Sequence, residues 1–252
     1  MHDNAVILRA DGIAKHFGRV VALRGANYEL RAGEVHAIVG DNGAGKSTLI
    51  KILSGVYRPD GGTIEIEGRE VTIDSPHTAR TLGIETVYQD LALADQLDAT
   101  SNLFLGREAF MPPPLGWLGF LDRKQMRRET EEAIKRLKVG IPSVQQPVNN
   151  FSGGQRQAIA VARAIAWGRR IVILDEPTAA LGVRESQMVL AMIKEIREQG
   201  LSVVMISHNL PEVFLVADRI TVLRLGNTIT TLETKDSTVE AVVGIMTGAL
   251  AA

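Results

Sequence analysis

The feature that most constrains this chain is a glycine-rich stretch that joins an apolar run to a segment with helical spacing. The apolar run ends at Val39, and the helical spacing starts at Ser47 and stops near Gly55. Glycines let backbone N–H groups curl around phosphate oxygens, and the N-terminus of the following helix adds positive potential. The stretch fits the phosphate-binding pattern of Gly, four residues and Gly-Lys-Ser. Its residues are Gly40, Asp41, Asn42, Gly43, Ala44, Gly45, Lys46, Ser47 and Thr48.

Two side chains of this loop have predicted roles in holding a nucleoside triphosphate. Lys46 would reach the β- and γ-phosphates, and the hydroxyl of Ser47 would coordinate Mg²⁺. The alternative is a plain glycine-rich turn. The strand before the loop and the helix after it favour the phosphate site.

A second apolar run ends in two adjacent carboxylates. Residues 171–174 are all aliphatic, and burial of such a run makes a strand whose end presents Asp175 and Glu176. Asp175 is predicted to lie near the metal, and Glu176 to polarise the attacking water as a general base. A pair that caps the end of a strand is the alternative. Phosphoryl transfer needs the loop, the metal ligand and the base together, which favours the catalytic interpretation.

Between these two motifs, a Ser-Gly-Gly-Gln stretch opens a segment with helical spacing. Ser152 is a good N-cap, and Gly153 and Gly154 allow the backbone to approach an anion closely. Helix capping alone is the simpler explanation. The stretch ends at Gln155, and the chain contains it once, just as it contains one phosphate-binding loop.

The order of these three motifs resembles that of the ATP-binding cassette family, whose members drive ABC transporters. The resemblance extends from about residue 8 to residue 248. It implies that the nucleotide is ATP, that Asp175 assists Mg²⁺ and that Glu176 is the catalytic carboxylate. It also implies that the Ser-Gly-Gly-Gln stretch completes the site of a second copy, where Ser152 and Gly154 touch the γ-phosphate. Two copies would then face each other head to tail.

Three further residues gain predicted roles from the same resemblance. Gln89 stands at the Q-loop position, where it would link the metal and the water to the helical part of the fold. His208 stands at the switch-histidine position, near the γ-phosphate. With Lys46 and Glu176, these two residues complete the predicted catalytic set. Phe17 matches the aromatic residue that stacks on adenine, and a place in the hydrophobic core is the alternative.

One position departs from the family pattern. The family usually carries an aspartate in the D-loop, which crosses the interface between two copies, and this chain has Gly182 there. Glycine supplies no carboxylate, so we expect communication between the two sites to be weaker or differently arranged. Hydrolysis is still expected, because the metal ligand and the base are present.

The remaining segments predict the fold class. From residue 171 onward, apolar strands alternate with helical patterns, which predicts an α/β fold with a mostly parallel sheet. Short strands at 5–8 and 26–30 begin a β-rich N-terminal annex. Residues 123–138 have the spacing of an amphipathic helix, whereas the prolines at 112–114 exclude regular helix.

By resemblance, the chain is a single P-loop NTPase domain of the RecA-like type over residues 5–250. Its antiparallel annex and parallel core would occupy about 5–90 and 166–250. A helical subdomain would occupy about 91–165.

Composition and charge argue against several classes of function. The net charge is −1, so there is no basic excess and nucleic-acid binding is not expected. Cysteine is absent from the sequence, which excludes disulfides and thiolate metal sites. The start, Met1 to Asn4, lacks the character of a signal peptide, and no apolar run reaches the roughly 18 residues needed to span a bilayer. Any role at a membrane is therefore expected to come through a partner.

Several stretches resemble the ATP-binding subunits of bacterial importers for ribose, xylose or fructose, namely 40–49, 178–185 and 206–210. This likeness implies a subunit on the cytoplasmic face of the inner membrane, bound to a transmembrane permease. A periplasmic sugar-binding protein would be an indirect partner. The proline segment and Trp117 are expected to face the permease or to form a plain solvent loop.

Other functions stay open at this point. A soluble ABC ATPase of translation or DNA maintenance normally has two cassettes in one chain or a long coiled-coil insertion, and this chain has neither. An ABC transporter subunit for a lipid, a drug or an amino acid is the alternative within the family. A P-loop kinase is disfavoured, because the Ser-Gly-Gly-Gln stretch has no role in a kinase.

Overall fold

A computed structural model describes residues 5–168 and 170–250. Met1 to Asn4, on which the expectation about a signal peptide rests, lie outside the described residues. The centre of the fold is a six-stranded sheet in the order β10-β9-β3-β8-β7-β6, in which β10 alone runs antiparallel to its neighbour. The strands are β3 (Val35–Val39), β6 (Ile84–Val87), β7 (Ile171–Asp175), β8 (Ser202–Ile206), β9 (Arg219–Arg224) and β10 (Asn227–Glu233).

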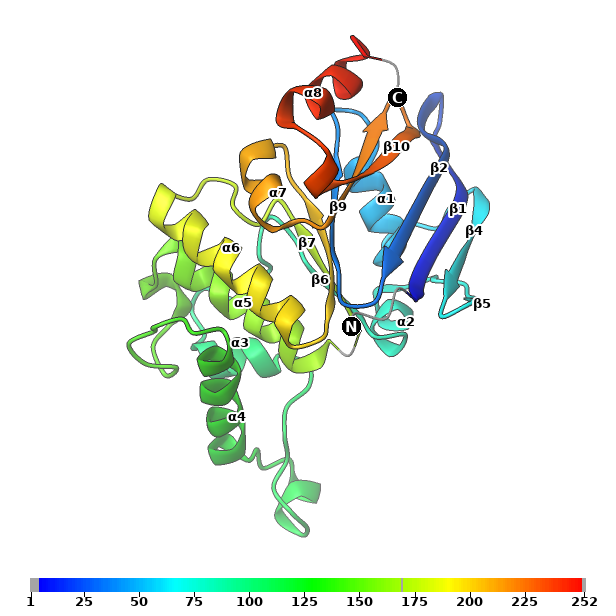
Figure 1. The fold of residues 1–252 in the computed structure, drawn as a ribbon. Coiled ribbons are helices and arrows are strands. Elements are labelled where there is room, and N and C mark those ends of the chain that lie inside the picture. The colour runs from blue at the N-terminus through cyan, green and yellow to red at the C-terminus, as the bar shows by residue number, and fades with distance from the viewer. Residues whose placement is uncertain (1–4, 169, 251–252) are drawn as a thin grey trace.

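The two faces of this sheet are covered by different layers, as Figure 1 shows. Along β7, Ile171 and Ile173 face α1 and a second sheet, whereas Val172 and Leu174 face the layer of α5 and α6. Burial on both faces explains why this strand is an unbroken apolar run. The helices of the core are α1 (Lys46–Leu53), α2 (Pro76–Thr81), α6 (Val183–Glu198), α7 (Leu210–Val216) and α8 (Val239–Thr247), with the 3₁₀ turn η3 (Thr234–Asp236).

The second sheet is antiparallel, with the order β2-β1-β4-β5. Its first two strands are much longer than the short strands expected at 5–8 and 26–30. They form one continuous hairpin that closes at the pair Phe17 and Val20, so cross-strand pairing extends both strands beyond their apolar segments. The strands are β1 (Val6–Phe17), β2 (Val20–Arg31), β4 (Gly61–Ile66) and β5 (Arg69–Glu70).

Residues between β6 and β7 form a separate group of helices at one end of the molecule (Figure 1). The predicted helix at 123–138 is present and ends at Arg136, two residues early. The triple proline lies outside the α-helices, as expected. The elements are α3 (Ala99–Phe104), α4 (Arg123–Arg136) and α5 (Gly153–Trp167), with 3₁₀ turns η1 (Leu115–Leu118) and η2 (Val148–Asn150).

The predicted fold class, an α/β P-loop fold with a mostly parallel sheet and an antiparallel annex, is confirmed. Within residues 5–168 and 170–250, no helix combines the length and the apolar character that crossing a bilayer requires.

Candidate nucleotide-binding site

The predicted site residues follow the carboxyl ends of neighbouring parallel strands. The phosphate-binding loop follows β3, Gln89 follows β6, Glu176 follows β7 and His208 follows β8. Because these ends meet at one edge of the sheet, they bring residues from distant parts of the sequence together. A cavity of about 540 Å³ lies there. It is lined by Val20, Val21, Ala22, Asn42, Gly43, Ala44, Gly45, Lys46, Ser47, Thr48, Gln89, Glu176 and His208.

Two glycines of the loop are required by its backbone and by its close neighbours. Gly40 has φ +156°, and a Cβ there would lie 2.2 Å from the carbonyl oxygen of Leu223. Gly45 has φ +105°, and a Cβ there would lie 2.6 Å from Cδ2 of Leu23. The sequence therefore contains glycine where the loop is pressed against β9 and β2.

The ammonium group of Lys46 lies inside the curve of the loop. Its Nζ donates to the carbonyl oxygens of Gly40 at 2.6 Å and Asp41 at 3.0 Å. Burial lowers the pKa of Lys46, while the negative charges of Glu176, Asp41 and Asp175 act in the opposite direction. A cation held in this partly desolvated position is suited to bind an anionic phosphate group.

The two carboxylates at the end of β7 have different surroundings. Burial, with the charge of Glu176, raises the pKa of Asp175 above its ordinary value. Glu176 adopts a left-handed backbone with φ +51°, and its N–H donates to Ile206 at 3.0 Å. Its Oε2 lies 2.7 Å from Nδ1 of His208. A strained backbone is held here by neighbouring strands, and it directs one carboxylate into the cavity beside a histidine.

The predicted metal ligands have the chemistry that Mg²⁺ favours. Ser47 offers a hydroxyl, Gln89 an amide oxygen and Asp175 a carboxylate, and hard divalent cations prefer such oxygen ligands. In the described ranges, no group of three or more His, Cys, Asp or Glu side chains forms a metal site. Mg²⁺ commonly takes only one or two protein ligands and completes its shell with phosphate oxygens and water. The donor set therefore fits the ion.

Phe17 lies at the end of β1, just before the hairpin turn that leads to the cavity wall. Its side chain is 41% exposed, so it does not belong to the hydrophobic core. The ring packs edge to face on Tyr57 with centroids 5.2 Å apart. Phe17 is not one of the residues that line the cavity, so adenine stacking stays a prediction.

The Ser-Gly-Gly-Gln stretch lies apart from this cavity, and none of its residues lines it. Ser152 is the N-cap of α5 and forms a reciprocal capping box with Gln155 at 3.3 and 3.0 Å. Ser152 and Gly153 are exposed, whereas Gly154 is buried. A Cβ on Gly154 would lie 2.6 Å from Cε of Met188, so this glycine lets α5 pack closely on α6.

Comparison with known proteins agrees with these motifs. A profile described as "ABC transporter" matches residues 23–179. The chain belongs to the ABC transporter family. It is 49% identical to the fructose import ATP-binding protein FrcA of Rhizobium meliloti, covering 96% of this chain and 94% of that protein. It is 44% identical to the xylose/arabinose import ATP-binding protein XylG of Sulfolobus acidocaldarius, with the same two shares covered.

The solved structures show the same cassette architecture. A nucleotide-free ATP-binding cassette from an ABC transporter superposes with a TM-score of 0.77 at 25% identity, covering 94% of this chain and 97% of that one. The ADP conformation of another cassette gives a TM-score of 0.78 at 24% identity, covering 96% and 95%. At this identity the second likeness shows the fold alone.

The sequence-based interpretation of this ABC cassette missed two arginines of α5. Nη1 and Nη2 of Arg163 donate to the carbonyl oxygens of Ala92 at 2.8 Å and Leu91 at 2.9 Å. Arg156 pairs with Asp95 at 2.5 Å. Leu91 and Ala92 have left-handed backbones and follow Gln89 closely. The helix that begins at the Ser-Gly-Gly-Gln stretch thus holds the segment that leads away from the predicted Q-loop glutamine.

A sequence signal for these contacts exists but is weak. The two arginines are seven residues apart, which places them on the same face of a helix. Nothing in that spacing identifies their partners, which are the carboxylate of Asp95 for Arg156 and the carbonyl groups of Leu91 and Ala92 for Arg163.

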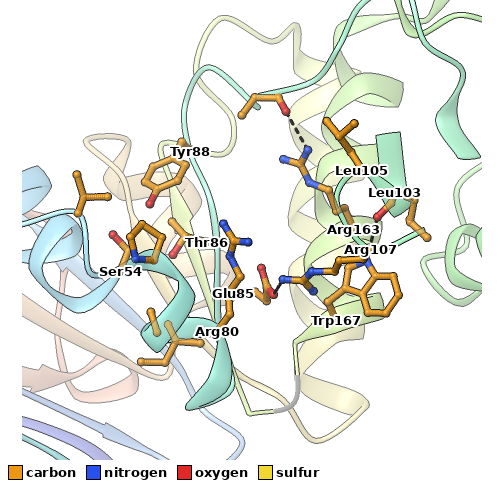
Figure 2. Close-up of a pocket in the computed structure, with 15 residues that line it drawn as sticks. Ser54, Arg80, Glu85, Thr86, Tyr88, Leu103, Leu105, Arg107, Arg163 and Trp167 are labelled. Atoms are coloured by element: carbon orange, nitrogen blue, oxygen red, sulfur yellow. Dashed lines mark hydrogen bonds and ion pairs between the residues drawn. The ribbon is translucent and has the colours of Figure 1, made fainter. Parts of the chain in front are cut away.

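A second cavity, of about 360 Å³, separates the edge of the six-stranded sheet from α3 and α5 (Figure 2). Arg107 crosses it and pairs with Glu85 of β6 at 2.5 Å. Arg80 and Arg163 also point into it, which gives the cavity a basic wall. Tyr88, the neighbour of Gln89, lines the same cavity, so a single segment borders both cavities.

Proposed function

We propose that this chain is the ATP-binding and ATP-hydrolysing subunit of an importer that energises uptake of a monosaccharide through a separate membrane permease. The observation that carries the proposal is the first cavity, where Lys46, Gln89, Glu176 and His208 meet around a phosphate-binding loop. The sugar is supported by the relatives, which are named for import of fructose and of xylose or arabinose.

The residues of the cavity divide the work of hydrolysis among them. The loop and Lys46 would hold the β- and γ-phosphates of ATP, and Glu176 would orient a water molecule and accept its proton. His208 lies within hydrogen-bonding distance of Glu176, so it would fix the direction of that carboxylate and border the γ-phosphate. Bound Mg²⁺, held by Ser47, Gln89 and Asp175, would neutralise charge that develops on the phosphate oxygens.

The active unit is proposed to be a pair of chains. In one copy, Ser152 and Gly153 are exposed, and neither lines the cavity of its own chain. A head-to-tail pair would place this helix start, with its positive end, against the γ-phosphate of the partner. A bacterial ABC transporter cassette described as dimeric shares this fold, with a TM-score of 0.75 at 23% identity.

The second cavity is proposed to receive a cytoplasmic loop of the permease. It lies between the sheet and the helical region, so a loop held there would sense their relative movement. Its arginines favour a loop with acidic side chains. The chain would then lie at the cytoplasmic face of the inner membrane, and a periplasmic sugar-binding protein would deliver the sugar to the permease.

The test is uptake in cells that lack the native gene and carry either the wild-type chain or Glu176→Gln. We expect wild type to restore ATP-dependent uptake of labelled fructose, ribose or xylose. Glu176→Gln should lower purified ATPase activity by a factor on the order of 100 or more while ATP binding persists. Near-native hydrolysis by Glu176→Gln would contradict the base assignment, and hydrolysis without sugar uptake would favour a different solute or a non-transport ATPase.

A further inference from the structure

A hairpin-like arm, residues 106–122, projects from the helical region between α3 and α4. In Figure 1 it extends beyond the end of α4 and away from both sheets. Its two limbs are joined by backbone hydrogen bonds from Met111 to Phe120 at 2.9 Å and from Asp122 to Ala109 at 2.8 Å. Gly116 closes the tip, where a Cβ would lie 2.0 Å from the carbonyl oxygen of Met111. These contacts give the arm and its tip a defined conformation.

The tip of the arm exposes large apolar side chains. Trp117 is 83% exposed and Leu118 is 72% exposed. Single exposed apolar residues are ordinary, but six within eleven residues form a patch, and such patches mark interaction surfaces. The arm patch consists of Phe110, Met111, Leu115, Trp117, Leu118 and Phe120.

Basic residues lie at the root of the arm, behind this patch. Residues 106–128 contain five basic and two acidic side chains, and of the basic ones Arg107 is paired with Glu85 in the second cavity. Among the described residues, Arg123, Lys124 and Arg128 form no salt bridge, although Arg127 pairs with Glu131 at 2.8 Å. An aromatic and aliphatic tip with positively charged residues at its root is typical of protein segments that lie in the headgroup region of an anionic membrane.

The arm also starts at the surface that we propose for the permease. Leu105, just before the arm, and Arg107, in its first limb, line the second cavity. If a permease loop occupies that cavity, the arm projects next to the place where the permease enters the bilayer. The position of the arm relative to the membrane thus rests on the proposed function, whereas its amphipathic character does not.

We propose that this arm inserts its apolar tip into the headgroup region of an anionic bilayer, with Trp117 and Leu118 as anchors and Arg123 and Lys124 as contacts for lipid phosphates. Tryptophan suits this position, because its ring is apolar and its N–H finds polar partners in the interface. Lysine and arginine keep their charges at the phosphates while their stems cover apolar surface.

The test is co-sedimentation of the purified wild-type chain with vesicles of phosphatidylcholine, with or without phosphatidylglycerol. We expect binding to the anionic vesicles. Changing Trp117→Ser together with Leu118→Ser should weaken it about tenfold or more, because two apolar anchors are lost. Arg123→Gln with Lys124→Gln should weaken binding to anionic vesicles only. Leu215→Ser, which changes a leucine of α7 that is 61% exposed, is the matched control and should bind like wild type.

Tryptophan fluorescence adds a direct readout, because the chain has two tryptophans. Trp167 packs on Phe104 with centroids 5.4 Å apart, so Trp117 is the one that insertion would affect. We expect a blue shift on addition of anionic vesicles in wild type and its loss in Trp117→Phe.

The absence of vesicle binding by wild type, or binding that Trp117→Ser with Leu118→Ser leaves intact, would overturn the proposal. So would a defect of that variant that appears only with the permease present, which would assign the patch to a protein surface. ATPase activity measured in parallel separates the two hypotheses. It tests the proposed function and should stay unchanged in the arm variants.

Discussion

The two parts of this cassette that we propose contact phosphate differ in how much of a site each one forms within a single chain. The phosphate-binding loop lies in a cavity with Gln89, Glu176 and His208, which the sheet edge brings together. The Ser-Gly-Gly-Gln stretch opens α5 with Ser152 and Gly153 exposed, and its capping box pairs the N–H groups of Ser152 and Gln155. One part is a cavity lined by residues from several strand ends, whereas the other is an exposed helix start outside that cavity.

This difference has a physical origin. Parallel strands converge at one edge, so several chain segments supply residues to a single cavity. A helix N-terminus supplies only a few N–H groups and a positive potential, and these can bind an anion that another molecule holds. The comparison is the basis of our proposal that the site is divided between two copies, and the predictions below test the parts of the cassette on which it depends.

The largest change in ATPase activity is expected when two inactive variants are mixed. Lys46→Ala damages the loop, and Ser152→Asp keeps an N-cap but repels phosphate, so each alone should lose activity by a factor on the order of 100. A mixed pair retains one intact site, so an equal mixture should recover about a quarter of wild-type ATPase activity if pairing is random. A mixture as inactive as its components would contradict the divided site. Ser152→Thr, which keeps cap and hydroxyl, is the control.

A smaller loss of ATPase activity is expected from changing Arg163, which connects the helix of the Ser-Gly-Gly-Gln stretch to the segment after Gln89. Arg163→Ala removes both hydrogen bonds to Leu91 and Ala92, so Gln89 should lose its position. We expect kcat to fall on the order of tenfold, with little change in KM for ATP, because the loop is untouched. Arg163→Lys should be intermediate, since a lysine cannot bind two carbonyls as a fork. A rise in KM with unchanged kcat would show that the arginine acts on nucleotide binding instead.

Lowering the pH is expected to destabilise the folded state through residues around β3, the strand that precedes the phosphate-binding loop. His36 of β3 is fully buried and packs on Tyr28, with Nε2 2.7 Å from Thr221 and Nδ1 3.3 Å from Glu34. Burial lowers the pKa of His36, although Glu34 acts in the opposite direction. Burial would raise the pKa of Glu34, but its contact with His36 and the hydrogen bond that it accepts from the N–H of Arg31 at 2.7 Å hold the pKa below its ordinary value, and the charge of Arg219 acts in the same direction.

The lowered pKa values of His36 and Glu34 change the free energy of unfolding in the same direction. Below about pH 6.5 the unfolded chain takes up a proton that native His36 resists, and below about pH 4.5 the same holds for Glu34. The free energy of unfolding should therefore fall as the pH falls below about 6.5. Urea unfolding of wild type and His36→Gln measures this. Equal pH dependence in the two proteins would contradict the assignment to His36.

The smallest effect is expected next to the Ser-Gly-Gly-Gln stretch. Gly182 is the N-cap of α6 with φ −71° and ψ 169°, a conformation that any residue adopts, and it makes no side-chain cap. Gly182→Asp would add a capping carboxylate, and its Cβ would displace only the flexible end of Glu185. We expect a gain of a few tenths of a kcal/mol in thermal unfolding. A steeper dependence of hydrolysis on ATP concentration would show that this position limits communication between sites.

Much of the nucleotide site could be predicted from the sequence, because its motifs are local. Gly40 to Thr48 form one continuous segment that follows the strand β3 and opens the helix α1, and the run before Asp175 identifies a buried strand end. The fold class followed from the alternation of strands and helices. The length of the β1–β2 hairpin did not, because pairing between strands extended both beyond their apolar segments.

The sequence by itself determined the family, the phosphate-binding loop and the carboxylates, since each depends on residues that are neighbours in the chain. Only the tertiary structure placed His208 against Glu176, tied Arg163 to the segment after Gln89 and set the Ser-Gly-Gly-Gln stretch apart from the cavity of its own chain. The first two are contacts between residues 32 and 72 positions apart in the sequence. They arise from how helices pack on the sheet, and local patterns of residues carry no information about that packing.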